Sequence, residues 1–193
     1  MTEQLPDLYI LRHGETLWNL EERMQGGLDS ALTEKGHAQA ERMAEVLRAR
    51  GVGPEGFDLW TSPKGRAIET ARYVQEATGL VARIDEDLRE ISVGDWVGLS
   101  KAEIEAKWPA PKPDEDFVDF YARAPNGDSF EAFWDRMGGV IARIKRPTVI
   151  VTHGMTSRFL RTRVLGLGLK DLRAVEGGQG AVFHITNGQH FKL

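Results

Sequence analysis

A short apolar run that ends in an arginine and a histidine constrains this chain more than any other feature. The run covers residues 8–11 and is followed at once by Arg12, His13 and Gly14. Such a run is typical of a buried strand, and open α/β sheets hold their ligands at the carboxyl ends of their strands. The pattern therefore predicts a ligand site at a sheet edge, where a histidine nucleophile lies beside a fixed positive charge that can bind an anion.

Apolar runs alternate with amphipathic stretches along the rest of the chain, which is typical of an α/β fold. We expect strands over residues 57–61, 80–84 and 148–152, helices over 33–50, 63–78, 100–108 and 130–145, and a terminal hairpin over 180–193. The Pro-rich and acidic stretch 109–127 is expected to connect two of these helices. The predicted fold class is three-layer α/β/α, with a central sheet that is mostly parallel and has an antiparallel edge.

Two other predicted strands also end in residues that can bind an anion. His153 and Gly154 follow the strand 148–152, and Arg66 lies in the first turn of the helix after the strand 57–61. If these strands are parallel neighbours of the first one, two arginines and two histidines converge at one edge of the sheet. The helices that begin there add backbone N–H groups and the positive ends of their dipoles. This combination predicts a site for a phosphoryl group.

Composition limits which other functions are possible. The chain of 193 residues has a net charge of −4, and its 25 basic residues are scattered, so we expect no nucleic-acid partner. It has no cysteine, which excludes disulfides and a Cys nucleophile and fits a reducing compartment. Residues 1–7 show no cationic start, and no later stretch is long and apolar enough for a membrane span. We expect a cytoplasmic protein with one domain over residues 1–193 and no membrane partner. Nothing in the sequence indicates an oligomeric state.

Five groups of motifs follow one another along the chain. They are Arg12-His13-Gly14-Glu15-Thr16 with Asn19, Leu32-Thr33 with Gly36, Thr61-Ser62-Pro63 with Arg66, Leu88-Arg89-Glu90 with Gly94, and Val151-Thr152-His153-Gly154. In this order and at this spacing they resemble the histidine phosphatase superfamily, in the branch that contains the cofactor-dependent phosphoglycerate mutases and related phosphatases. The resemblance spans nearly the whole chain and implies a phosphoglycerate mutase-like fold.

The resemblance also implies a role for each site residue. His13 is expected to be the nucleophile that forms a phosphohistidine, and Glu90 is expected to donate a proton to the leaving oxygen. The residues expected to bind the phosphoryl group are Arg12, Asn19, Arg66, His153 and Gly154. Two planar guanidinium groups suit this task because they neutralise charge with fixed geometry. Neighbouring arginines should also disfavour the imidazolium form of His13 and keep it nucleophilic.

Other interpretations of these residues are weaker. A metal site built from His13, Glu15 and His153 is conceivable, but the adjacent arginines would repel a cation. Glu90 lies in a run of acidic residues, and such a run is usually a solvated surface; the motif around it favours a functional role. The histidines expected to be structural are His37, His184 and His190.

The sequence favours one family activity and leaves two alternatives open. The mutases carry a longer insertion after the Glu90 segment and a tyrosine near the position of Val93. Here the corresponding segment, residues 109–117, is short, and most of its charged residues are acidic. Gly154 stands where phytase-like relatives carry an aspartate proton donor, which leaves that role to Glu90. We therefore expect a metal-independent phosphatase that acts on a small phosphorylated metabolite and needs no cofactor.

The first alternative is a phosphoglycerate mutase, for which 2,3-bisphosphoglycerate would be a primer. The second is a catalytically silent module that only binds a phosphorylated ligand. Such a module would normally have lost one of the residues on which catalysis depends. All of these are present, namely Arg12, His13, Arg66, Glu90 and His153.

Overall fold

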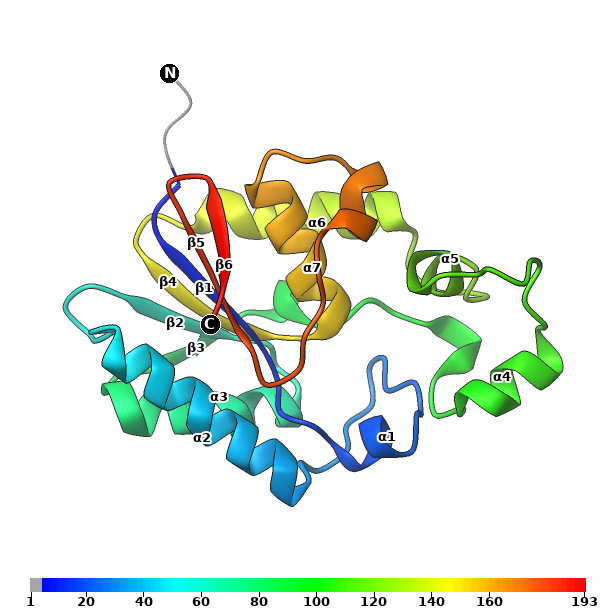
Figure 1. Ribbon diagram of the computed structural model, residues 1–193, viewed down its shortest axis with the longest axis horizontal. Coiled ribbons are helices and arrows are strands. Elements are labelled where there is room, and N and C mark those ends of the chain that lie inside the picture. The colour runs from blue at the N-terminus through cyan, green and yellow to red at the C-terminus, as the bar shows by residue number, and fades with distance from the viewer. Residues whose placement is uncertain (1–4) are drawn as a thin grey trace.

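The computed structural model describes residues 5–193 and has a six-stranded sheet at its centre (Figure 1). The strands are β1 (Leu8–Arg12), β2 (Asp58–Thr61), β3 (Ala82–Ile84), β4 (Thr148–Thr152), β5 (Val182–Thr186) and β6 (Gln189–Lys192). Their order is β3-β2-β4-β1-β5-β6. The pairs from β3 to β1 are parallel, whereas β5 is antiparallel to β1 and β6 is antiparallel to β5. This arrangement confirms the predicted fold class, including the terminal hairpin at the sheet edge.

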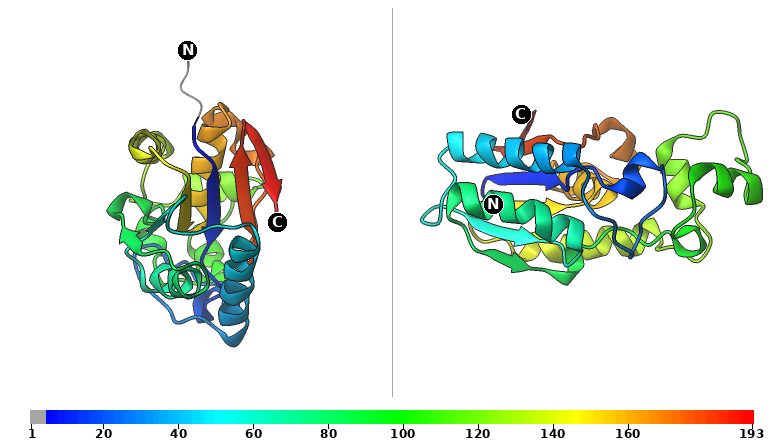
Figure 2. Two further views of the ribbon diagram at one scale, coloured as in Figure 1. Left: turned by 90° about the vertical axis from the view of Figure 1, so that its left-hand side faces the viewer. Right: turned by 90° about the horizontal axis from the view of Figure 1, so that it is seen from below.

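Helices cover both faces of this sheet (Figure 2). They are α1 (Leu17–Leu20), α2 (Glu34–Ala49), α3 (Gly65–Thr78), α4 (Lys101–Lys107), α5 (Phe117–Ala122), α6 (Phe130–Arg143) and α7 (Gly154–Val164), with 3-10 turns η1 (Glu86–Leu88), η2 (Gly94–Trp96) and η3 (Leu169–Ala174). Helices α2 and α3 pack on one face, and α6 and α7 pack on the other.

The central strands are buried on both faces, as a parallel sheet between two helical layers requires. In β1, Leu8 and Ile10 contact the layer of α6 and α7, whereas Tyr9 and Leu11 contact the layer of α2 and α3. All residues of β4 are buried. Because β1 lies between β4 and β5 and β4 lies between β1 and β2, the carboxyl ends of β1, β2 and β4 are neighbours.

Most helix boundaries agree with the sequence prediction, but α3 begins later than expected. Its first residue is Gly65, so Pro63 precedes the helix and is not in its first turn. The reason is a cap from a distant segment: Asp29 accepts hydrogen bonds from the backbone N–H groups of Gly65, at 2.8 Å, and Arg66, at 3.4 Å. Arg66 still lies in the first turn, as predicted, and Gly79 ends the helix in a left-handed conformation.

The acidic stretch 109–127 is more than the connecting segment that the sequence predicted, because it contains α5. Asp116 caps this helix by accepting hydrogen bonds from the N–H groups of Val118 and Asp119, both at 2.9 Å. Arg173 forms ion pairs with Asp116 and Asp119 and ties the helix to η3. The helix has only six residues, and its acidic composition is typical of a loop, so the sequence did not predict it. Its ion pairs hold it where Tyr121 lines the site described below.

A direct contact between two glycines fixes the turn that follows β1. A Cβ atom on Gly14 would lie 2.2 Å from the carbonyl oxygen of Gly36, and one on Gly36 would lie 2.0 Å from that of Glu15. The turn after β1 therefore packs backbone against backbone on the first turn of α2. Thr33 caps this helix by accepting a hydrogen bond from the N–H of Gly36, as the sequence predicted.

Residues 1–4, on which part of the expectation about the amino end rests, lie outside the described residues. Within residues 5–193, none of the helices has the length and apolar character needed to cross a membrane.

Candidate active site

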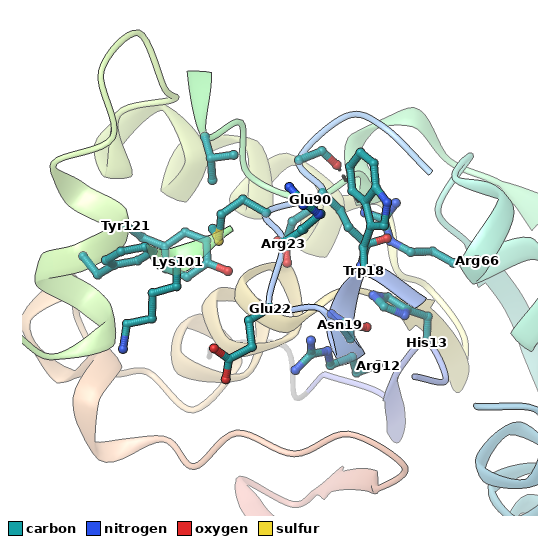
Figure 3. Close-up of a pocket in the computed structure, with 15 residues that line it drawn as sticks. Arg12, His13, Trp18, Asn19, Glu22, Arg23, Arg66, Glu90, Lys101 and Tyr121 are labelled. Carbon is teal, nitrogen blue, oxygen red and sulfur yellow. Dashed lines mark hydrogen bonds between the residues drawn. The ribbon is translucent and has the colours of Figure 1, made fainter. Parts of the chain in front are cut away.

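His13 lies directly after β1, and its ring orientation is fixed by the backbone. Its N–H donates to the carbonyl of Thr152 at 2.9 Å, and its Nδ1 lies 2.7 Å from the carbonyl oxygen of Gly14. A carbonyl oxygen can only accept, so Nδ1 carries the proton and Nε2 keeps its lone pair. His13 is only 3% exposed, and it lines a cavity with Arg12 and Arg66 (Figure 3).

The surroundings of His13 favour the neutral imidazole. Burial lowers its pKa well below the usual 6.5, and the charges of Arg12 and Arg66 lower it further, against a smaller effect of the hydrogen bond to Gly14. This lowering of the pKa was expected from the sequence, where the neighbouring arginines were the only cause that could be identified. Burial is the larger cause, and it became visible only once the fold was known.

His153 comes from the end of β4 and lies against His13. The ring centroids are 5.3 Å apart in an edge-to-face arrangement. Nε2 of His153 lies 2.7 Å from Oγ of Ser62, and its Nδ1 is buried without a hydrogen-bond partner in the described part of the chain. Burial, followed by the charge of Arg66, lowers the pKa of His153 well below 6.5. The predicted convergence of β1, β2 and β4 thus brings both histidines together.

The two arginines are held in different ways. Arg66 is 3% exposed, and its Nη1 donates to the carbonyl of Leu28 at 2.6 Å and to the carboxylate of Asp29 at 2.8 Å. Its Nη2 donates to the carbonyl of Gly26 at 3.2 Å, and its Nε is buried and has no hydrogen-bond partner in the part of the chain that the structure describes. Nε of Arg12 is also buried without a partner among residues 5–193. Both guanidinium groups therefore keep donors for an anionic ligand.

Glu90 is bound to the start of α7. Its Oε1 accepts hydrogen bonds from the N–H of Ile91, the N–H of Thr156 and the hydroxyl of Thr156, at 3.0, 3.0 and 2.9 Å. Its Oε2 accepts one from the N–H of Met155 at 3.0 Å. The carboxylate therefore supplies the cap that α7 lacks from its own N-cap residue, His153.

Asn19 lies on α1 and is oriented by three donors. Its Oδ1 accepts hydrogen bonds from the N–H and hydroxyl of Thr16 and, at 3.0 Å, from Nε2 of Gln179. This leaves its amide nitrogen as a donor toward the cavity, which Asn19 lines (Figure 3). Gly154 is the first residue of α7 and lies beside Arg12, because a Cβ atom on Gly154 would be 3.5 Å from Cζ of that arginine.

The cavity has a volume of about 260 Å³ and two distinct ends. Figure 3 shows Arg12, His13, Asn19 and Arg66 at one end and Lys101 and Tyr121 at the other, whereas Gly154 lines an adjoining cavity. Trp18, Met24 and Val93 complete the outer wall. Burial raises the pKa of Tyr121 to about 12, so its phenol stays neutral. Tyr121 and Gln179 escaped the sequence analysis, because one lies on an unpredicted helix and the other on an irregular segment.

Glu15, a member of the conceivable metal site, points elsewhere. Its carboxylate accepts hydrogen bonds from the hydroxyl of Thr33 and from Lys35, at 3.0 and 2.8 Å. The three other histidines lie away from the cavity: His37 contacts Tyr73, His184 stacks on Tyr9, and His190 contacts Arg161. No cluster of three or more potential metal ligands is found within residues 5–193.

The sheet order and the convergence of motifs at its edge define a phosphoglycerate mutase-like α/β protein. Over residues 8–191 the chain matches the histidine phosphatase superfamily (branch 1). The chain therefore belongs to this superfamily, as the motifs indicated, and it is an enzyme of the histidine phosphatase type.

The relatives of this chain include proteins named as phosphatases and proteins named as probable mutases. The chain is 38% identical to glucosyl-3-phosphoglycerate phosphatase of Mycobacterium tuberculosis (strain CDC 1551 / Oshkosh), over 90% of this chain and 81% of the relative. It is 34% identical to a probable phosphoglycerate mutase of Cronobacter sakazakii, over 83% of this chain and 75% of the relative. A solved mycobacterial glucosyl-3-phosphoglycerate phosphatase in complex with VO3 superimposes with a TM-score of 0.80 at 34% identity, covering 94% of this chain and 91% of the other.

Proposed function

We propose that the chain is a metal-independent phosphatase that hydrolyses small phosphomonoesters through a phosphohistidine on His13. One observation carries the proposal: the proton of His13 is held on Nδ1 by Gly14, so that a buried Nε2 keeps its lone pair beside two guanidinium groups. This is the arrangement that attack on a phosphoryl group requires, because the nucleophile is neutral and the charge of the phosphate is balanced by arginines.

The proposed reaction has two steps. In the first, Nε2 of His13 attacks phosphorus, the P–N bond forms, and the bond from phosphorus to the leaving alcohol breaks while the acid form of Glu90 protonates the alcohol. In the second, a water attacks phosphorus, gives its proton to the carboxylate of Glu90, and the P–N bond breaks to release phosphate. The enzyme then has its starting protonation state, and the two steps as proposed involve no metal or other cofactor.

The remaining predicted site residues would bind the phosphoryl oxygens. Arg12 and Arg66 supply charge, His153 and the amide of Asn19 supply further donors, and the N–H of Gly154 lies beside Arg12 at the positive end of α7. Two solved structures of mycobacterial glucosyl-3-phosphoglycerate phosphatase that resemble this chain are complexes with VO3 and with inorganic phosphate. They support the assignment of this end of the cavity to a phosphoryl group.

Glu90 is suited to its proposed role because its two carboxylate oxygens accept different numbers of hydrogen bonds. Oε1 has three donors, whereas Oε2 has one and keeps capacity for a proton. Glu90 also lines the cavity that contains His13. A carboxyl group at this position can protonate an alkoxide, which otherwise leaves poorly.

The substrate is proposed to be a small phosphorylated metabolite, in keeping with the cavity of about 260 Å³. The named substrate of one relative, glucosyl-3-phosphoglycerate, is a candidate of this class. Screening a panel of phosphorylated metabolites for release of phosphate tests the proposal, and absence of release from every ester, including p-nitrophenyl phosphate, would overturn it. We also propose that residues 1–193 form one domain that works in the cytoplasm.

A phosphoglycerate mutase is the second candidate, favoured by the probable mutases among the relatives. It would use the same phosphohistidine and pass the phosphoryl group to an alcohol in place of water. Against it, Val93 lines the cavity near the position where the mutases carry a tyrosine. With 3-phosphoglycerate we expect phosphate release or no reaction. Efficient formation of 2-phosphoglycerate that depends on 2,3-bisphosphoglycerate would establish the mutase instead.

A further inference from the structure

A second cavity, of about 150 Å³, adjoins the catalytic one. Arg12, Glu90 and Tyr121 line both cavities and form the boundary between them. The rest of the second cavity lies between α5, the first turns of α7 and the loop 175–181, which runs alongside α7 in Figure 1. In the proposed reaction Glu90 faces the leaving oxygen, so a substituent close to that oxygen can extend into this second cavity.

Two arginines of α7 line the second cavity, and neither forms an ion pair with an acidic side chain of residues 5–193. Arg161 is 1% exposed, and Arg158 is half-buried. Their hydrogen-bond acceptors are backbone carbonyls, the hydroxyl of Ser157 and the ring of His190, all of which are uncharged or neutral groups. The side chain of Glu176, the nearby acid, forms an ion pair with Lys192 at 2.9 Å instead.

Both guanidinium groups keep N–H donors after these contacts are made. A guanidinium has five N–H groups. In Arg158, the hydrogen bonds to Leu172 and Val175 both come from Nη1, which leaves Nε and Nη2 without a partner in the described residues. In Arg161, Nη1 and Nη2 each make one hydrogen bond and keep one N–H. These free donors are the kind that bind carboxylate or phosphate oxygens.

The charges around the cavity are unbalanced. Three guanidinium groups, of Arg12, Arg158 and Arg161, face the single carboxylate of Glu90, which α7 already binds. Burial and the neighbouring charge of Arg158 lower the pKa of Arg161 to about 9, and burial lowers that of Arg158 as well. Arg158 and Arg161 are therefore destabilised as cations, although the charge of Glu176 acts in the opposite direction, and an anion in the cavity would relieve this.

The cavity also has room for a small anionic group. Gly177 and Gly178 form part of its wall, and a Cβ atom on Gly177 would lie 2.8 Å from Nη2 of Arg158. A side chain at this position would therefore cover the free donors. The volume of 150 Å³ corresponds to the liquid volume of about five waters, which is enough for a carboxylate or a phosphate group.

We propose that this second cavity binds a second anionic group of the substrate, a carboxylate or a phosphate carried on the leaving alcohol, and that Arg158 and Arg161 are its donors. The proposal rests on the proposed phosphatase activity and narrows its substrates to esters that carry two anionic groups close together. It assigns a binding role to residues that lie outside the cavity containing His13.

The test compares esters that differ only in the second group. The carboxylate pair is 3-phosphoglycerate and glycerol 3-phosphate, and the phosphate pair is propane-1,3-diol bisphosphate and 3-hydroxypropyl phosphate. For each enzyme the ratio of kcat/KM within a pair is measured, because this ratio does not depend on the fraction of folded protein. The enzymes are the unmodified chain, Arg158→Met, Arg161→Met and the control Arg163→Met. Arg163 lies on α7 and also holds a backbone carbonyl, that of Trp134, but does not line the cavity.

We expect the unmodified chain to prefer the doubly anionic ester of at least one pair by roughly 10- to 100-fold, the value of one charge-assisted contact. The pair that shows the preference identifies the group as carboxylate or phosphate. Arg158→Met and Arg161→Met should abolish most of the preference, and Arg163→Met should keep it. A ratio near one in the unmodified chain, or an unchanged ratio in both cavity variants, would overturn the proposed anion-binding role of the second cavity. Release of phosphate from p-nitrophenyl phosphate in the same experiment would still support the proposed phosphatase activity. If p-nitrophenyl phosphate and all four esters are inert, both proposals fail.

Discussion

Thr156 donates both its backbone N–H and its hydroxyl to the same oxygen of Glu90, at 3.0 and 2.9 Å. Thr156 is fully buried and lies in the first turn of α7. The proposed proton donor is therefore held by the helix whose N-cap residue is His153. This contact makes Thr156 a positioning residue for Glu90.

Thr156→Val keeps the shape of this side chain and removes its hydroxyl. We expect a slower first step with an alkyl phosphate, by roughly 10-fold, the value of one hydrogen bond to a charged group. The first step with p-nitrophenyl phosphate should change little, because its leaving group needs no proton. The control is Thr162→Val on the same helix, whose hydroxyl donates to the carbonyl of Arg158. Equal slowing of both substrates would mean that Thr156 supports only the structure.

Replacing Glu90 itself should separate the two classes of leaving group more strongly. General acid catalysis is worth about 10²- to 10⁴-fold, so Glu90→Gln should slow phosphoryl transfer from an alkyl phosphate by that amount. Transfer from p-nitrophenyl phosphate should suffer far less. The pre-steady-state burst isolates this step from the hydrolysis of the phosphoenzyme, in which Glu90 is proposed to act as base. If both bursts slow equally, the proton donor is another group.

Rapid quenching with labelled substrate should trap phosphate on His13. A phosphohistidine is labile in acid and stable in alkali, and His13→Ala should remove the label. Ser62→Ala serves as a comparison, because Ser62 contacts His153 and leaves the nucleophile in place. A stable label in an active enzyme on any other residue would exclude the covalent mechanism proposed for His13.

Acidification should destabilise the fold through the two active-site histidines. Their pKa values are lowered well below 6.5, chiefly by burial, so between these values and pH 6.5 the unfolded chain binds more protons than the folded one. The free energy of unfolding then falls as pH falls. From pH 6.5 to 5.5 we expect a loss of roughly 1 kcal/mol for each histidine.

Urea unfolding in phosphate-free buffer measures this loss, and a variant with His13→Gln and His153→Gln is the control. The control should lose about 2 kcal/mol less than the unmodified chain over the same pH interval. An equal loss in both proteins would show that other groups dominate the acid response.

Removal of metal ions should leave the activity unchanged. The proposed site binds phosphate through guanidinium, imidazole and amide donors, Glu90 is held by α7, and Glu15, the carboxylate of the conceivable metal site, is paired with Lys35. Phosphate release is measured before and after dialysis against a chelator. A loss of activity that a divalent cation restores would contradict the proposed metal independence.

The parts that could be predicted from the sequence are those with local causes. The apolar runs of β1 and β4 identify buried strands, and residues just after them must lie at the sheet edge, so the meeting of His13 with His153 could be expected. The helices expected over residues 33–50 and 100–108 begin at Thr33 and Ser100, which cap α2 and α4 in the structure. Whether His13 forms the phosphohistidine stays a prediction.

The parts that could not be predicted depend on contacts between distant segments. Asp29 caps α3 from a loop more than thirty residues earlier, which moved the start of that helix. Helix α5 is held by Arg173, far along the chain, and short acidic segments of this kind have no periodicity of their own. Gln179 reaches Asn19 across 160 positions. No local pattern carries this information.

The close contact of Gly14 with Gly36 distinguishes two parts of the site: the backbone that positions His13, and the side chains that line the rest of the cavity. Main-chain atoms make this contact, so it depends on the absence of a side chain at these two positions and not on particular side-chain groups. The outer wall of the cavity is built from side chains such as Trp18, Met24 and Tyr121, which can be exchanged one at a time. In proteins with this fold, substrate preference can therefore change while the catalytic residues stay the same.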